Sequence, residues 1–444
     1  MKKILAVLLA LMMVFSLVAC EKAPAKDEGK EKEASAEADK AKDDKAADEK
    51  TEEKAADDKA VAEDEVPEDF HIGIVTGTIS QTEDEQRGAE AMIELYGATE
   101  DGGRVTHLNY PDNYSQETET TIQQITSLAD DPKMRVIVVN QGIPGTAAAF
   151  TQIREKRPEI VLLAGNSQED TALIEGAADM VCDPDNVNRG YLIPLAAKKL
   201  GATKFVHVSF PRHMGIELLS LRRDIMEATC EKIGLEFYAE TAPDPTTDIG
   251  TPGAQQFILE NMPKWVEKYG KDTCFFATND AHTEPMLLKV AELGAIFVEQ
   301  DLPSPILGYP GAFGLDLKDV AGNWPEILKR VEEVAIEKGA SGRMGTWAYS
   351  FGFTTTQALA EYGIQIVEGK AKKGNLEDLL KVYEKFTPGA EWNGSLFVDK
   401  NSKETKENHA LVYQDDYIFG QGYLGITKEE IPDLYALLDE YKNK

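Results

Sequence analysis

The residues best placed to bind a small molecule follow short apolar runs that have the composition of β-strands. In the first half of the sequence they are Thr76, Thr78, Ser80, Gln81, Asn140, Gln141, Asn166 and Ser167. In the second half they are Arg212, His213, Asn279, Asp280, Tyr309 and Phe313. Parallel sheets bind ligands beyond the carboxyl ends of their strands, where loops and helix N-termini converge. These residues are therefore predicted to contact a small polar ligand. The alternative for each Ser, Thr, Asn or Asp is a structural role as the cap of the following helix.

Arg212 and His213 form the most distinctive pair among these candidates. They lie in a Pro-Arg-His segment that follows an apolar run. A guanidinium at this place could bind a carboxylate or phosphate through two parallel hydrogen bonds. A surface ion pair within an acidic protein explains the same residues equally well, and the sequence does not decide between the two.

The motifs of common enzyme classes are absent from the sequence. It contains no GxxxxGKS or GxxxxGKT, no HExxH and no GxSxG. The segment around Asp183 and Asp185 begins like a calcium loop, but Asn188 replaces Gly at the sixth position and Pro194 replaces Glu at the twelfth. We therefore expect no catalytic residue, no metal site and no cofactor. Cys182, Cys230 and Cys274 are expected to be buried core thiols, with one disulfide as the alternative.

Strand-like and helix-like segments alternate from residue 71 onward. Strands are predicted at 71–76, 104–109, 135–139, 159–164, 204–209, 235–240, 273–277 and 305–307. Helices are predicted at 82–95, 116–128, 146–156, 188–200, 216–233, 255–269 and 284–293. The last part is predicted to hold helices at 324–338, 351–369 and 376–386 and strands at 396–398 and 410–417. Apolar strands separated by helices of about 11 or more residues indicate parallel sheets with right-handed crossovers. The fold class is therefore α/β.

The first twenty residues have the pattern of a signal peptide. Lys2 and Lys3 precede a fifteen-residue run from Ile4 to Val18 that is apolar except for Ser16. The run is shorter than the roughly 20 residues that a membrane-spanning helix needs. Leu17-Val18-Ala19-Cys20 resembles the lipobox of bacterial lipoprotein signals. That resemblance implies cleavage after Ala19 and a lipid on Cys20, which would hold the protein at the extracytoplasmic face of the cell membrane.

The segment from Glu21 to Asp69 is rich in Ala, Glu, Lys and Asp. It contains 20 acidic and 10 basic residues and no aromatic residue, so it carries −10 of the chain's formal net charge of −31. Such a segment has no apolar face to offset the entropy of ordering, and we expect a solvated tether between lipid and folded domain. The acidity of the whole chain repels phosphate backbones, which argues against nucleic-acid binding.

Several segments resemble the type 1 periplasmic-binding-protein fold. They are the opening strand HIGIV with its Thr/Ser/Gln loop, the segment RVIVVN followed by Gln-Gly, FFATND with the following helix end LKVAELG, and ILGY at 306–309. DPDNVNRG at 183–190 is similar to a crossover of sugar-binding members, but Tyr-Leu-Ile-Pro follows it in place of small residues. The whole chain also resembles an uncharacterised lipoprotein family filed as a domain of unknown function.

This resemblance implies a two-lobed fold, each lobe a parallel sheet flanked by helices. The predicted order is a signal peptide at 1–19, a lipidated cysteine and tether at 20–69, the first part of lobe 1 at 70–185 and lobe 2 at 186–310. Residues 311–444 are predicted to cross back, complete both lobes and add a C-terminal extension. The resemblance implies a solute-binding lipoprotein that passes a small polar molecule to an ABC-type permease. A ligand-sensing receptor with a membrane partner is the alternative, and a surface hydrolase ranks lower because its motifs are missing.

Overall fold

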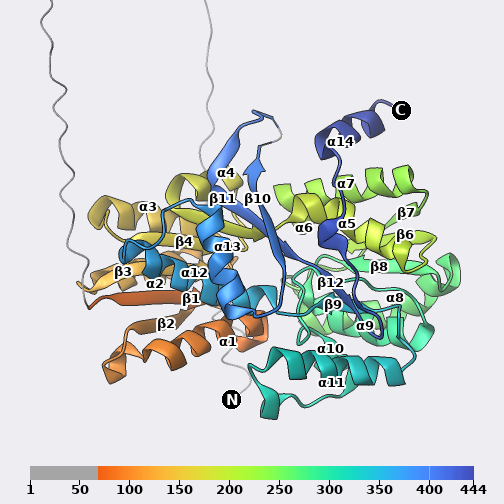
Figure 1. The fold of residues 1–444 in the computed structure, drawn as a ribbon, viewed down its shortest axis with the longest axis horizontal. Coiled ribbons are helices and arrows are strands. Elements are labelled where there is room, and N and C mark those ends of the chain that lie inside the picture. Colours follow the sequence, from red (N-terminus) through yellow and green to blue (C-terminus); the bar gives the residue numbers. More distant parts are fainter. Residues whose placement is uncertain (1–68, 400) are drawn as a thin grey trace, which may run out of the picture. The chain divides into compact units, whose positions relative to one another are not determined.

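The computed structural model describes residues 69–399 and 401–444. The predicted signal peptide, Cys20 and all of the predicted tether except Asp69 lie outside the described residues, and nothing is described of the side chain of Ser80. Within the described part of the chain, no helix is both long enough and apolar enough to cross a membrane. These residues fold into two α/β lobes (Figure 1).

The first lobe is built on a seven-stranded sheet. From edge to edge its strands are β10 (Trp392–Val398), β11 (Thr405–Gln414), β5 (Met180–Pro184), β4 (Val161–Gly165), β3 (Met134–Asn140), β1 (His71–Thr76) and β2 (Val105–Asn109). Neighbouring strands are parallel except β10 and β11, which form an antiparallel hairpin. The order β2-β1-β3-β4-β5 is that of a doubly wound sheet, in which ligands bind at the carboxyl ends of the strands.

Helices cover both faces of this sheet, as its continuous apolar strands predict. They are α1 (Ile79–Tyr96), α2 (Thr118–Ser127), α3 (Thr146–Lys156), α4 (Thr171–Ala177), α12 (Phe351–Val367) and α13 (Leu376–Phe386). Alternate residues of β3 divide between the two faces. Val136 and Val138 belong to the cluster that contains α1 and α12, whereas Ile137 and Val139 belong to the cluster that contains α2, α3 and α4. Full burial of each aliphatic side chain contributes about 1.5–3 kcal/mol, so both helical layers are bound firmly to the sheet.

The second lobe has three parallel strands in the order β7 (Glu236–Thr241), β6 (Lys204–Ser209) and β8 (Thr273–Ala277). Bridges at Ile296 and Phe297 link β8 to a second small sheet of β9 (Gly345–Trp347), β12 (Asp416–Ile418) and β13 (Gly422–Tyr423). The helices of this lobe are α5 (Asn186–Lys199), α6 (Pro211–Met214), α7 (Glu217–Ile233), α8 (Gly250–Tyr269), α9 (Asp280–Leu293), α10 (Tyr309–Phe313), α11 (Trp324–Glu337) and α14 (Leu434–Lys442). The predicted α/β class is confirmed.

The predicted strand at 305–307 is wrong. The corresponding place in the sheet is taken by the bridges at Ile296 and Phe297, and Ile306 and Leu307 lie on a loop that lines a cleft. Their apolar side chains suggested a strand, but they line the cleft instead. Strand β5 was missed because only three apolar residues precede Asp183, fewer than a strand pattern needs to stand out.

The chain passes between the lobes three times. The passages lie at Asp185 between β5 and α5, at 348–350 between β9 and α12, and at Asp415 between β11 and β12. A few residues at each passage can absorb the rotation of one lobe against the other, as hinges do. Buried ion pairs lie beside them. Arg189 Nε donates to Glu299 Oε1 at 2.7 Å, with both side chains 2% exposed, and Arg222 pairs with Asp301.

His409 on β11 is held between two carboxylates of lobe 1. Its Nδ1 is 2.8 Å from Glu175 Oε1 of α4, and its Nε2 is 3.0 Å from Asp183 Oδ2 of β5. Burial alone would lower the pKa of His409, but the hydrogen bonds to Asp183 and Glu175 outweigh it and raise the pKa to about 9. The imidazole is therefore charged at neutral pH and ties the returning strand β11 to the rest of the sheet.

This arrangement predicts a pH-dependent stability. Because the folded-state pKa of His409 lies above its unfolded value of about 6.5, its contribution is complete below about pH 6.5 and is lost as the pH rises through about 9. Urea unfolding should show a falling free energy of unfolding between about pH 7 and pH 9.5. His409→Gln should cost about 3–5 kcal/mol at pH 7, because it leaves two buried carboxylates without a cation.

The matched control is His71→Gln, which removes a partly exposed imidazole that pairs with Asp131. We expect this change to cost less than about 1 kcal/mol. If the fall in stability between pH 7 and pH 9.5 were the same in wild type and His409→Gln, the charged state assigned to His409 would be wrong.

Candidate ligand-binding cleft

A cleft with a volume of about 1140 Å³ lies between the two lobes, and residues of both lobes line it. The carboxyl ends of β1, β3 and β4 open into it from lobe 1, and those of β6 and β8 open into it from lobe 2. This is the edge at which parallel sheets bind ligands. The volume is slightly above the range of roughly 300–1,000 Å³ that small-molecule pockets occupy.

The structure brings most of the predicted contact residues to this cleft. Those that line it are Gln81, Asn166, Ser167, Gln141, Arg212, His213, Asn279 and Asp280. They follow five different strands, so no local sequence pattern joins them. Parallel topology places the carboxyl ends of the strands of each sheet at one edge, and the two sheets turn these edges toward the same cleft.

Five other predicted residues are not among the lining residues. Thr76 is buried and bonds to the Gly77 carbonyl and to His107, and Thr78 donates to Asp112 at 2.6 Å. Asn140 donates to the Gly352 carbonyl and to Thr356, so it fixes α12 against β3. The Tyr309 hydroxyl donates to the Gly345 carbonyl, and Phe313 packs in the core of lobe 2. The sequence did not distinguish these structural roles from ligand contact.

A chain of amide hydrogen bonds runs along the lobe 1 side of the cleft. Gln141 Nε2 donates to Glu85 Oε1 at 3.3 Å, and Gln168 Nε2 donates to Gln141 Oε1 at 2.6 Å. Tyr114 donates its hydroxyl proton to Gln168 Oε1 at 3.1 Å. Each amide is thereby held in a fixed orientation, which pre-organises this wall for hydrogen bonding to a ligand.

On the lobe 2 side, helix caps and ring packing fix the polar residues. Asn279 Oδ1 accepts from the Ala281 amide at 3.0 Å, so it does cap α9 while it also lines the cleft. His213 Nδ1 lies 3.3 Å from Thr278 Oγ1, and its ring centroid is 4.1 Å from that of Phe210. Burial lowers the pKa of His213 to about 4, so the imidazole is neutral at physiological pH.

Arg212 lines the cleft and is already paired. Its Nε and Nη2 donate to the two oxygens of Asp244 at 2.7 and 3.1 Å. Burial acts to raise the pKa of Asp244, but hydrogen bonds from Arg212 and Thr246 hold it down to about 2. The structure therefore contains the ion pair that was the alternative to anion binding by Arg212. Because Asp244 largely compensates the positive charge of Arg212, little of that charge is available to a ligand.

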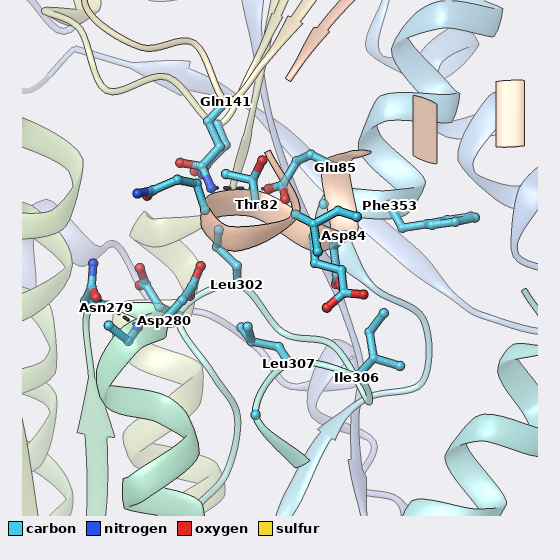
Figure 2. Close-up of a pocket in the computed structure, with 18 of the residues that line it drawn as sticks. Thr82, Asp84, Glu85, Gln141, Asn279, Asp280, Leu302, Ile306, Leu307 and Phe353 are labelled. Carbon is cyan, nitrogen blue, oxygen red and sulfur yellow. Dashed lines mark hydrogen bonds between the residues drawn. The ribbon is translucent and has the colours of Figure 1, made fainter. Parts of the chain in front are cut away.

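Carboxyl groups are the feature of the cleft that the sequence analysis missed. Asp84 and Glu85 of α1, Asp183 of β5 and Asp301 all line it, in addition to Asp280 of α9. In Figure 2, Glu85 and Gln141 lie close together on lobe 1, Asn279 and Asp280 lie at the end of a helix of lobe 2, and Leu302, Ile306 and Leu307 lie below α1 in this view. A helical pattern could have indicated Glu85, because it is four and seven residues before the buried Ala89 and Met92.

Burial changes the ionisation of these groups. It raises the pKa of Asp84 to about 6, against hydrogen bonds from Ser350 and Ser304 that lower it. Burial and the neighbouring Asp84 raise the pKa of Glu85 to about 7. The N-terminus of α9 favours a carboxylate at Asp280, but burial and the charges of Asp301, Glu85 and Asp84 raise its pKa well above the ordinary value.

Apolar and aromatic residues complete the walls. Leu302, Ile306 and Leu307 come from the loop after the lobe 2 sheet, and Tyr110 and Tyr114 come from lobe 1. The two tyrosine rings pack edge to face with centroids 5.5 Å apart. Residues 69–399 and 401–444 contain no group of three or more His, Cys, Asp or Glu side chains able to hold one metal ion. The cleft therefore suits an organic ligand with both polar and apolar parts.

Comparison with known proteins identifies related chains. The family model described as "Protein of unknown function (DUF3798)" matches residues 70–345, and a second family model matches residues 356–438. An uncharacterized protein of Treponema pallidum (strain Nichols) is 46% identical over 180 residues, which are 40% of this chain and 81% of that protein. A second uncharacterized protein of the same organism is 36% identical over 221 residues, which are 49% of this chain and 99% of the relative.

One solved structure has a closely similar fold. The crystal structure of a putative transcriptional regulator from Clostridium difficile 630 superposes with a TM-score of 0.65 at 24% identity, and the match covers 79% of this chain and 99% of that one. Together with the two lobes and their strand order, this likeness confirms the predicted type 1 periplasmic-binding-protein-like fold. The model match over residues 70–345 and the Treponema relatives show that the chain belongs to the DUF3798 family.

Proposed function

We propose that the protein is a solute-binding protein that captures a small polar ligand in the cleft between its lobes. The observation that carries the proposal is the composition of the cleft. Oriented amides such as Gln141 line it from lobe 1, and Asn279 and Asp280 line it from lobe 2. A ligand that bonds to both walls stabilises the closed arrangement of the lobes, because only the closed state makes both sets of contacts.

The three interlobe passages support this mechanism. They lie close to buried ion pairs that hold the local geometry, so rotation is confined to a few residues at Asp185, at 348–350 and at Asp415. The Glu85–Gln141 contact lies wholly within lobe 1 and the Arg212–Asp244 contact wholly within lobe 2. These two contacts can therefore move with their own lobes, whereas the hydrogen bond from Ser304 of lobe 2 to Asp84 of lobe 1 is made only while the two walls are together.

The proposal includes the location at the cell membrane that the sequence predicts. A lipid on Cys20 would hold the protein at the extracytoplasmic face of the cell membrane, and the acidic segment would let the two-lobed domain search for its partner within tens of Å. The partner that suits this arrangement is an ABC-type permease, to which the closed, loaded protein delivers its ligand. Anchoring by more than one acyl chain matters, because a single chain binds membranes only marginally.

Ligand capture predicts a gain in stability. A ligand at about 100 times its dissociation constant should add about 2.7 kcal/mol to the free energy of unfolding, and closure should reduce the radius of gyration. Thermal-shift screening of the purified protein against sugars, nucleosides, amino acids and carboxylates finds the ligand, and small-angle scattering measures closure. Gln141→Ala should weaken binding about tenfold, because it removes a hydrogen-bonding wall residue.

The matched control for this variant is Gln256→Ala, on the exposed face of α8, where the amide bonds only to Glu260. It should leave binding unchanged. If no compound stabilised the protein while a panel of hydrolase substrates was turned over, the solute-binding proposal would be wrong.

Anchoring at the membrane predicts that Cys20 carries a covalently attached lipid. In cells fed labelled palmitate, the wild-type protein should carry the label and partition into detergent, whereas Cys20→Ser should do neither. Cys182→Ser serves as the control, because Cys182 is a buried free thiol in β5. Equal labelling of Cys20→Ser and wild type would refute lipid attachment at Cys20.

A further inference from the structure

Four carboxyl groups approach one another across the cleft. Asp84 and Glu85 lie at the start of α1 in lobe 1, whereas Asp280 lies at the start of α9 and Asp301 lies on a loop of lobe 2. Asp301, Glu85 and Asp84 each act electrostatically on Asp280. The group therefore spans the two lobes, and it is not a property of one helix or one loop.

Only one of the four has a cationic partner among the described residues. Asp301 pairs with Arg222, whose side chain is fully buried. Asp84 accepts a hydrogen bond from the Ser350 hydroxyl, and Glu85, 3% exposed, accepts one from Gln141. Asp280 Oδ1 is shielded from solvent and has no hydrogen-bond partner within residues 69–399 and 401–444. Glu85 is thus a buried carboxyl group, and Asp84 and Asp280 are half-buried ones, and none of the three has a cationic partner among the described residues.

The basic residues that line the cleft do not fill this role. Arg87 pairs with Glu83 and Glu90 on the outer part of α1, and Arg212 pairs with Asp244. Lys318 also lines the cleft, but its side chain is exposed and, within the described part of the chain, forms no ion pair with any of the four carboxyl groups. An acidic surface would explain exposed carboxylates, because water and salt screen them. It does not explain buried ones, because burying an unpaired carboxylate is strongly unfavourable. A site that keeps such groups at the contact of two lobes is complementary to a positive charge.

We propose that the ligand of this cleft is an organic cation, whose ammonium or guanidinium group binds between Glu85 and Asp84 of lobe 1 and Asp280 of lobe 2. This inference rests on the proposed solute-binding function. Ammonium and guanidinium groups carry several N–H donors, which match the free oxygen of Asp280 and the carboxyl groups of α1. Such a cation would also remove the repulsion that opposes closure, because closing the lobes brings α1 and α9 nearer to each other.

The rest of the cleft favours an organic cation over a metal ion. The carboxyl groups do not form a cluster of metal-ligand geometry within the described residues. Leu302, Ile306 and Leu307 offer an apolar wall for a carbon chain, and the aromatic ring of the half-buried Tyr114 also lines the cleft. A volume of about 1140 Å³ also leaves room for more than an ion with its waters.

The test compares charged and neutral probes on the full-length protein. Thermal shift and calorimetric titration are run with spermidine, agmatine and arginine, with citrulline as the neutral partner of arginine, with glucose and ribose, and with calcium chloride. We expect one or more of the organic cations to bind, citrulline to bind at least about tenfold more weakly than arginine if arginine is a ligand, and calcium to give no saturable stabilisation.

Two variants test which carboxyl groups bind the cation. Glu85→Gln and Asp280→Asn keep the shape of the side chain and remove the charge, so each should raise the thermal midpoint of the unliganded protein at pH 7.5 and weaken cation binding at least about tenfold. A higher thermal midpoint together with weaker cation binding cannot come from misfolding, because misfolding would lower the thermal midpoint. The control is Glu377→Gln on α13, whose side chain is 82% exposed. It removes one charge from the surface and should change neither measurement.

Each other outcome is decisive. Binding of a neutral sugar without binding of any cation would overturn this inference and leave the solute-binding proposal intact. Saturable binding of calcium that depends on Glu85 and Asp280 would replace the organic cation by a metal ion. Equal cation binding by wild type, Glu85→Gln and Asp280→Asn would show only non-specific attraction to an acidic protein. No stabilisation by any probe or by the wider library would overturn both proposals.

Discussion

The ion pair between Arg189 and Glu299 is the interaction on which the lobe 2 wall of the cleft depends. Arg189 lies one helical turn after the first passage between the lobes, and Glu299 lies on the loop that continues to Asp301. Arg189 also donates to the Gln300 carbonyl at 2.8 Å. A buried pair of this kind adds little net stability, but loss of either partner leaves an uncompensated charge inside the protein. The ion pair therefore fixes the position of the loop that carries Glu299 more than it adds to the free energy of unfolding.

The position of Asp301 follows from this pair. The loop that Arg189 holds carries Asp301 to the cleft, where Arg222 compensates it. The same loop continues to Leu302, Ile306 and Leu307, which form the apolar wall. One buried guanidinium thus sets the place of both a charged and an apolar part of the ligand site. The residue that follows the first passage between the lobes, Arg189, therefore also positions a wall of the cleft.

Much of the fold could be predicted from the sequence because apolar runs such as RVIVVN, buried on both faces, have a pattern that surface segments do not share. Parallel topology places Gln141 and Asn166 at one edge of the lobe 1 sheet and Asn279 at the corresponding edge of the lobe 2 sheet. The roles of Asn140 and Tyr309 could not be predicted, because their partners Thr356 and Gly345 lie far away in the chain. Asp84 and Glu85 were missed because an acidic sequence hides two buried carboxyl groups among many exposed ones, and only the packing of α1 against α12 distinguishes them.

The sheet of lobe 1 is completed by strand β11, which is synthesised only after most of the chain. Strand β11 pairs with β5, yet most of lobe 2 and then α12, α13 and β10 of lobe 1 lie between them in the sequence. During synthesis, the edge of β5 stays unpaired until most of the chain has left the ribosome, and an unpaired strand edge is a template for wrong pairing. The three-stranded core of lobe 2 needs no such wait, because β6, β7 and β8 lie within one continuous stretch. The three-stranded core of lobe 2 can therefore form before either lobe is complete, whereas the second small sheet of lobe 2 also waits for the end of synthesis, because β12 and β13 follow β11 in the chain.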